Sequence, residues 1–110
     1  MLEIPAGSID SGEEPHVAAL RELREETGYR AKKLDLLSYF WTSPGFCTEG
    51  MYAFLATELE AGPHNPEVDE NIEVVEIPLA DIPQKISCGQ IQDAKTIASL
   101  LLVLSKAVDP

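Results

Sequence analysis

Three glutamates stand close together at positions that suit divalent-metal chemistry. Glu22, Glu25 and Glu26 lie in a stretch whose apolar residues recur with helical spacing. On a helical wheel with Leu20 at 0°, Glu25, Glu22 and Glu26 fall at roughly 140°, 200° and 240°. Leu20 and Leu23 lie on the opposite arc, which is the face expected to pack on a core. The segment is therefore predicted to be a helix with one acidic face.

The like charges of this face favour a bound cation. Glu22 and Glu26 are four residues apart, so in an isolated helix they repel by a few tenths of a kcal/mol. A hard divalent cation such as Mg²⁺ prefers oxygen ligands and removes that repulsion. The alternative is a solvated helix face, which is the commoner explanation for an isolated pair of glutamates. The residues around the pair distinguish the two interpretations.

Nine residues fit a single spaced pattern, GX5EX7REUXEEXGU, in which U is an apolar residue. They are Gly7, Glu13, Arg21, Glu22, Leu23, Glu25, Glu26, Gly28 and Tyr29. This pattern is the Nudix box, and the chain resembles the Nudix hydrolases at every spacing of it. The box spans residues 7–29, and its match favours the metal site over the solvated face.

Composition narrows the class of protein. The chain has 110 residues, 45% of them hydrophobic, which predicts a single domain over residues 1–110. A formal net charge of −11 argues against a nucleic-acid partner, whose binding face would be basic. No apolar run is long enough to span a membrane. Cys47 and Cys88 lack metal-ligand spacing and are expected to be reduced thiols, so a cytoplasmic location is predicted.

The elements that must position these residues can be outlined from apolar patterns and from breaker residues. A helix is predicted from Glu14 or Pro15 to a stop at Gly28, with an earlier start as an alternative because Ser11 and Glu14 have capping-box spacing. Strands are predicted over residues 34–41, 51–59 and 72–77, and residues 1–4 are predicted to be the end of a strand. A short helix over 79–85 is expected to be interrupted at Pro83. The last helix is predicted from Asp93, as its N-cap, to Ala107.

Residues outside the box are similar to one branch of the family, the ADP-ribose pyrophosphatases. Three stretches resemble motifs of that branch. They are Ile4-Pro5-Ala6-Gly7 before the box, Ser43-Pro44-Gly45-Phe46 with Glu49, and the acidic stretch Asp69-Glu70-Asn71. Pro44 stands fifteen positions after Tyr29, where the branch carries a marker proline. The implied fold is α+β, an α/β/α sandwich with a mixed sheet, the Nudix loop–helix–loop and a C-terminal helix.

The resemblance also implies a reaction and a set of roles. The reaction is Mg²⁺-dependent hydrolysis of the pyrophosphate bond of ADP-ribose or a related ADP-sugar, giving AMP and a sugar phosphate; Mn²⁺ is an alternative metal. The implied metal ligands are Glu22, Glu26, Glu25 through a bound water, and the backbone carbonyl of Ala6. The implied catalytic acids are Glu70 as first choice for the general base, Glu73 as second, and Glu25. Ser43, Gly45 and Glu49 are implied substrate contacts. Gly7, Glu13, Arg21 and Gly28 are implied to be structural, with Arg21 holding Glu13 or Glu25.

Simpler roles remain open for several of these residues. Glu73 lies in a predicted strand between apolar neighbours, where an outward solvated side chain is the plainer interpretation. For Glu70 the alternative is a solvated loop acid. Ser43 and Gly45 are also typical of an ordinary turn.

The start of the chain departs from the family pattern, in which several strands precede the box. Only six residues precede Gly7. The chain is therefore expected to be a fragment of a longer protein, or else to complete its sheet in a homodimer by strand swapping. Two rival functions stay open: hydrolysis of another nucleoside diphosphate derivative, and an inactive Nudix-like binding module.

Overall fold

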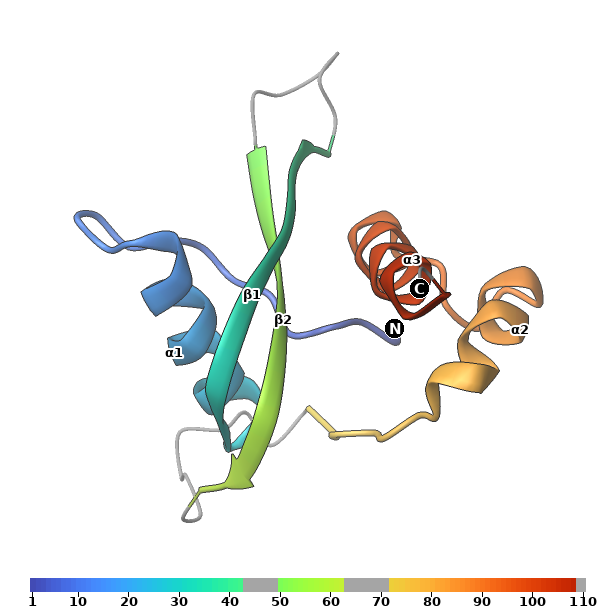
Figure 1. The fold of residues 1–110 in the computed structure, drawn as a ribbon, viewed down its shortest axis with the longest axis horizontal. Coiled ribbons are helices and arrows are strands. Elements are labelled where there is room, and N and C mark those ends of the chain that lie inside the picture. Colours follow the sequence, from blue (N-terminus) through green and yellow to red (C-terminus); the bar gives the residue numbers. More distant parts are fainter. Residues whose placement is uncertain (43–49, 63–71, 109–110) are drawn as a thin grey trace. The chain divides into compact units, whose positions relative to one another are not determined.

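The computed structural model describes residues 1–42, 50–62 and 72–108 of the chain (Figure 1). In order, its elements are α1 (Pro15–Thr27), β1 (Tyr29–Trp41), β2 (Gly50–Ala61), the 3₁₀ turn η1 (Leu79–Asp81), α2 (Ile82–Ser87) and α3 (Ala94–Val108). Strands β1 and β2 pair as an antiparallel two-stranded sheet.

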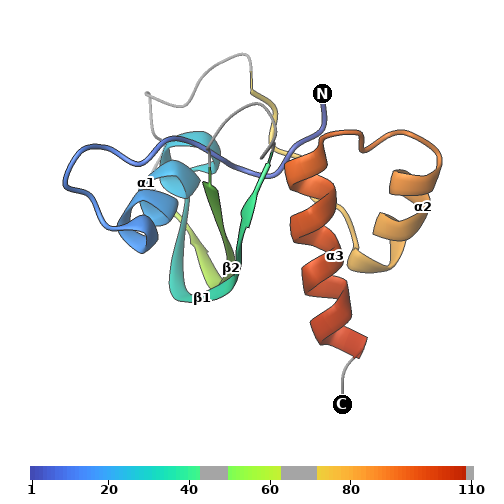
Figure 2. The same cartoon turned by 90° about the horizontal axis from the view of Figure 1, so that it is seen from above.

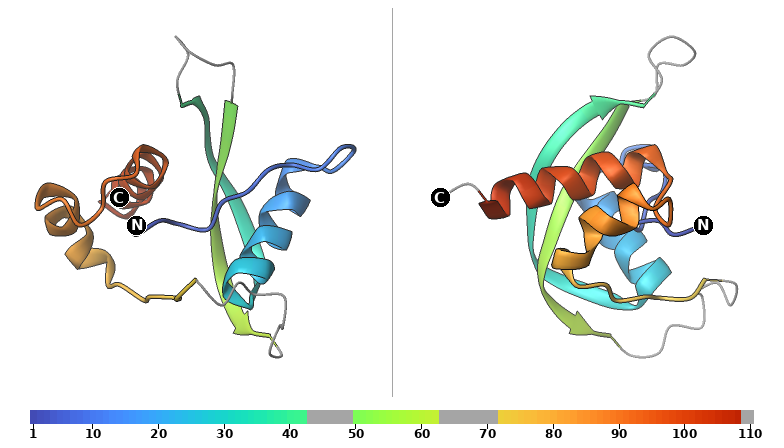
Figure 3. Two further views of the ribbon diagram at one scale, coloured as in Figure 1. Left: turned by 180° about the vertical axis from the view of Figure 1, so that it is seen from behind. Right: turned by 90° about the vertical axis from the view of Figure 1, so that its right-hand side faces the viewer.

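The chain divides into two compact units, and the paired strands contribute to both. The α1 unit consists of Pro5–Leu36 and Phe54–Val75, and the α3 unit of Met1–Ile4, Leu37–Ala53 and Glu76–Pro110. In the α1 unit, helix α1 runs beside the paired strands (Figure 2). In the α3 unit, α2 and α3 lie next to each other (Figure 3).

Helix α1 begins and ends where local sequence signals predicted. Pro15 occupies its first turn, where the missing N–H of proline costs no hydrogen bond. Gly28 adopts a left-handed conformation with φ of 79°, and its N–H donates to the Arg24 carbonyl at 2.9 Å. A residue with a Cβ is strained at that φ, so glycine is the natural stop. The predicted helix boundaries are confirmed.

Strand β1 starts directly after this stop. It begins at Tyr29 instead of the predicted Leu34, and β2 extends at both ends beyond the predicted 51–59. The N–H of Gly62, just past β2, donates to the Gly28 carbonyl at 2.9 Å. The end of β2 is therefore hydrogen-bonded to the junction between α1 and β1. This contact explains why the paired strands extend beyond the apolar stretches from which they were predicted.

Two predicted strands are wrong. Residues 1–4 and 72–77 have no regular secondary structure. The Ile4 N–H donates to the Thr96 hydroxyl oxygen at 3.2 Å instead of to a neighbouring strand. Val74 and Val75 are about half exposed. Strand-forming residues adopt a strand only where a partner edge is available, and no described residue supplies one to either segment.

Helix α3 begins at the predicted cap. A carboxylate oxygen of Asp93 accepts from the Thr96 N–H at 3.0 Å and from the Thr96 hydroxyl at 2.8 Å. These bonds, with the Lys95 ammonium, lower the pKa of the Asp93 carboxyl. Ile91, Thr96 and Ser99 are buried in this unit. The predicted interruption at Pro83 is wrong, because Pro83 lies in the first turn of α2, where proline is tolerated.

The helices and the antiparallel pair confirm an α+β fold. In the described segments the sheet holds only β1 and β2, so the mixed sheet of the sandwich stays a prediction. Over the same segments, none of the helices has the length and apolar character needed to cross a membrane.

Candidate metal and catalytic site

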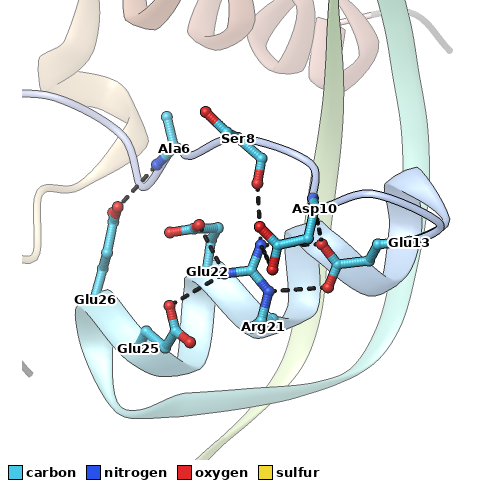
Figure 4. Close-up of polar contacts among 8 residues, drawn as sticks. All are labelled: Ala6, Ser8, Asp10, Glu13, Arg21, Glu22, Glu25 and Glu26. Carbon is cyan, nitrogen blue, oxygen red and sulfur yellow. Dashed lines mark hydrogen bonds and ion pairs between the residues drawn. The ribbon is translucent and has the colours of Figure 1, made fainter. Parts of the chain in front are cut away.

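Two glutamates of α1 lie against the same short stretch of backbone before the helix. The Ala6 N–H donates to Glu26 Oε2 at 3.1 Å. At Gly7, an added Cβ would overlap the carboxylate of Glu22, so only a residue without a side chain leaves that carboxylate in place. Figure 4 shows Glu22 and Glu26 on the side of α1 that faces this stretch. One helical turn thus brings both carboxylates to the Ala6–Gly7 backbone.

Arg21 holds the loop and the helix together through different edges of its guanidinium group. Its Nε and Nη2 donate to the two carboxylate oxygens of Glu13, at 2.9 and 3.0 Å. Its Nη1 donates to Glu22 at 2.9 Å and to Glu25 at 3.2 Å (Figure 4). The sequence predicts Glu13 and Glu25 as alternative partners of Arg21. In the structure, Arg21 contacts both.

Two further residues of the loop contact this centre and were not singled out from the sequence. The carbonyl of Ser8 accepts from Arg21 Nη2 at 3.0 Å, and the Asp10 carboxylate lies 3.6 Å from the same nitrogen. The Asp10 N–H donates to Glu13 at 3.0 Å. Their only signal was a turn composition between Gly7 and Glu13.

The ion pair with Arg21 dominates the electrostatics of Glu13. The hydrogen bonds from the guanidinium and from the Asp10 N–H lower the pKa of the Glu13 carboxyl to about 2. The same pairing raises the pKa of Arg21 above its ordinary value. Both groups are therefore charged at neutral pH.

Acid should weaken the attachment of the loop to α1. The Glu13 pKa is about 2 in the folded protein against an ordinary value of 4.5, so its contribution to stability is complete above pH 4.5 and is lost as the pH falls toward 2. We expect Glu13→Gln to flatten the pH dependence of the unfolding free energy across this window, as measured by urea denaturation. Glu14→Gln is the control, because Glu14 is exposed and makes no side-chain capping bond. An unchanged pH slope in Glu13→Gln would contradict the assignment.

The residues present fit a hard divalent cation. Glu22 and Glu26 offer carboxylate oxygens beside the Ala6–Gly7 backbone. Because Gly7 has no Cβ, it leaves space for the carboxylate of Glu22. In the described segments, no three or more acidic, histidine or cysteine side chains are grouped so that they could hold a metal ion together. Arg21 Nη1 donates to one carboxylate oxygen of Glu22 and to one of Glu25.

The remaining predicted site residues are not brought to this cluster by any described contact. Ser43, Gly45, Glu49 and Glu70 lie outside the described residues. Glu73 is described and exposed, and it makes no hydrogen bond or ion pair with another described residue. It lies in an irregular segment, so its predicted setting within a strand is wrong.

Comparison with known proteins shows which family this chain belongs to. The model of the NUDIX domain matches residues 1–100. The chain therefore belongs to the Nudix family, as its box indicated.

Individual relatives are similar in sequence, and one solved structure is similar in fold. A Bacillus subtilis (strain 168) protein named ADP-ribose pyrophosphatase is 48% identical over 98 residues, covering 87% of this chain and 53% of the relative. A Cronobacter sakazakii GDP-mannose pyrophosphatase is 38% identical over 103 residues, covering 91% and 53%. The crystal structure of an ADP compounds hydrolase superposes with a TM-score of 0.77 at 29% identity, covering 88% of this chain and 52% of the other. The chain thus spans about half the length of the relatives it matches.

Proposed function

We propose that this chain belongs to a Nudix pyrophosphohydrolase that cleaves the pyrophosphate bond of ADP-ribose or a related ADP-sugar, releasing AMP and a sugar phosphate. The observation that carries the proposal is the pair of α1 carboxylates, Glu22 and Glu26, lying against the Ala6–Gly7 backbone. The name of the Bacillus subtilis relative, ADP-ribose pyrophosphatase, supports the choice of substrate.

The roles follow from the chemistry that a diphosphate requires. Glu22, Glu26 and the Ala6 carbonyl would hold Mg²⁺, with Mn²⁺ as an alternative metal. Glu25 would contribute through a metal-bound water. When bound, the metal supplies charge neutralisation around the diphosphate and assists ionisation of the attacking water. Glu70 is our first choice to accept the proton of that water, and Glu73 the second.

The other residues position the substrate or the site. Ser43, Gly45 and Glu49 are proposed to contact the phosphates or the terminal ribose. Arg21 and Glu13 keep the loop on α1, since their ion pair joins the two segments. Residues 1–110 are proposed to form a single domain of a cytoplasmic enzyme that acts as a homodimer.

A second substrate class is favoured by one comparison. The Cronobacter sakazakii relative is named GDP-mannose pyrophosphatase, and it matches a similar share of this chain. The proposed metal ligands would serve any nucleoside diphosphate sugar, because the chemistry at the diphosphate does not involve the base. The choice between adenine and guanine therefore rests with residues that recognise the base.

A substrate panel tests the proposal. ADP-ribose and GDP-mannose would be incubated separately with the chain and Mg²⁺, and the products separated by anion-exchange chromatography. We expect AMP and ribose 5-phosphate from ADP-ribose, at least about tenfold faster than GMP from GDP-mannose, because a site that hydrogen-bonds one base rejects the other. Chelation with EDTA should stop both reactions. Metal binding without turnover of either nucleotide would contradict the hydrolase and favour a binding module.

A further inference from the structure

Arg21 is the cation at the centre of an acidic cluster in the α1 unit. Its guanidinium group contacts the carboxylates of Asp10, Glu13, Glu22 and Glu25 within 3.6 Å. Two of these acids belong to the loop and two to the acidic face of α1. A single positive charge therefore balances acids of both segments.

The two edges of the guanidinium differ in how firmly they are held. The edge formed by Nε and Nη2 binds Glu13 through two parallel bonds, and the side chains of Arg21 and Glu13 are only 20% and 14% exposed. Such fork-like pairs are among the strongest charged contacts. Nη1 instead divides its bonds between Glu22 and Glu25, and the longer bond goes to Glu25, which is 38% exposed. The helix-facing edge is thus the weaker one.

We propose that Arg21 is an internal counter-cation that takes the place of the metal: it balances Glu22 and Glu25 in the metal-free protein and opposes the binding of a divalent cation there. This inference rests on the proposed function, because it requires a metal site on α1. Metal binding weakens only the Nη1 contacts, while the Glu13 pair keeps the loop attached. The site accordingly stays folded without metal, and the bound metal exchanges readily.

Coulomb's law gives the direction of the effect. A divalent cation beside Glu22 would lie within a few ångströms of the guanidinium, where like charges still repel appreciably despite solvent screening. Removing the arginine charge should strengthen metal binding by about tenfold and should destabilise the metal-free protein, whose acids are then unbalanced.

The test compares Arg21→Gln with Arg24→Gln. Arg24 is on the same helix, is exposed, and makes no side-chain ion pair with another described residue. Mn²⁺ alone is the probe, with its dissociation constant measured by electron paramagnetic resonance and the thermal midpoint measured in EDTA and at saturating Mn²⁺. We expect Arg21→Gln to bind Mn²⁺ about tenfold more tightly, to melt lower in EDTA and to gain more from Mn²⁺ than the wild type. Arg24→Gln should behave as the wild type.

A second variant separates charge from loop anchoring. Glu13→Gln removes the anchor and leaves the Arg21 charge in place, so it should lower the midpoint in EDTA without tightening Mn²⁺ binding. If Glu13→Gln tightens binding as much as Arg21→Gln does, anchoring is the cause and the proposal is wrong. An Arg21→Gln protein that stays unfolded at saturating Mn²⁺ would also overturn it, because the metal then cannot replace the arginine.

The outcomes separate the two levels of inference. Wild-type protein that binds no Mn²⁺ would contradict the proposed metal site itself. Wild-type protein that binds Mn²⁺ with the same dissociation constant as Arg21→Gln would contradict the counter-cation role alone.

Discussion

Replacing Glu26 with glutamine is expected to lower kcat by about 10²- to 10³-fold while leaving the free energy of unfolding almost unchanged. Glutamine keeps an oxygen that accepts from the Ala6 N–H, which Glu26 binds at 3.1 Å, so the loop contact survives. It removes the negative charge that a metal requires. It also ends the repulsion with Glu22, which offsets a few tenths of a kcal/mol.

The measurement is kcat for ADP-ribose at saturating Mg²⁺, together with urea unfolding of the same preparation. Glu14→Gln is again the matched control, since it removes one carboxylate from the exposed N-cap of α1, where the side chain makes no capping bond. An undiminished kcat in Glu26→Gln would rule out Glu26 as a metal ligand. A large loss of stability would show that its contact with Ala6 is mainly structural.

Replacing Gly7 with alanine is expected to weaken divalent-metal binding by about tenfold or more, with a stability loss below about 1 kcal/mol. The new Cβ would overlap the Glu22 carboxylate, which must move away. That carboxylate is the end of a flexible side chain, so the shift costs little folding energy, yet it displaces a proposed ligand. Metal affinity and stability should therefore separate.

Gly12→Ala is the matched control for Gly7→Ala. Gly12 lies in the same loop with φ of 79°, and a Cβ there meets no atom within 4 Å. Alanine at Gly12 should cost about 1 kcal/mol through backbone strain and leave the Mn²⁺ dissociation constant unchanged. Gly7→Ala should instead weaken metal binding and cost little stability. Equal metal affinity in Gly7→Ala and the wild type would remove the basis for placing the metal beside Glu22.

Local signals in the sequence predicted the helices well and two of the strands poorly. The start of α1 at Pro15, its stop at Gly28 and the Asp93 cap of α3 depend on neighbouring residues only, and all three are confirmed. Residues 1–4 and 72–77 have strand-like composition but no regular structure. A strand needs a partner edge, which is often distant in the chain, and composition carries no information about that edge.

The amino-acid sequence by itself determined the family and the acidic face of α1. Those features depend on spacing: the box residues recur at set intervals, and residues four apart share a helix face. Only the tertiary structure decided which groups this face contacts. The path of the loop brings Ala6 to Glu26 and the Gly7 backbone to Glu22.

The same holds for Arg21. Its spacing identified a structural arginine and offered Glu13 and Glu25 as alternative partners. The folded loop supplies both at once, together with Glu22, because a guanidinium group has two edges and the loop returns along one of them. Contacts between a loop and a helix depend on the whole path of the chain between them, which residue spacing does not encode.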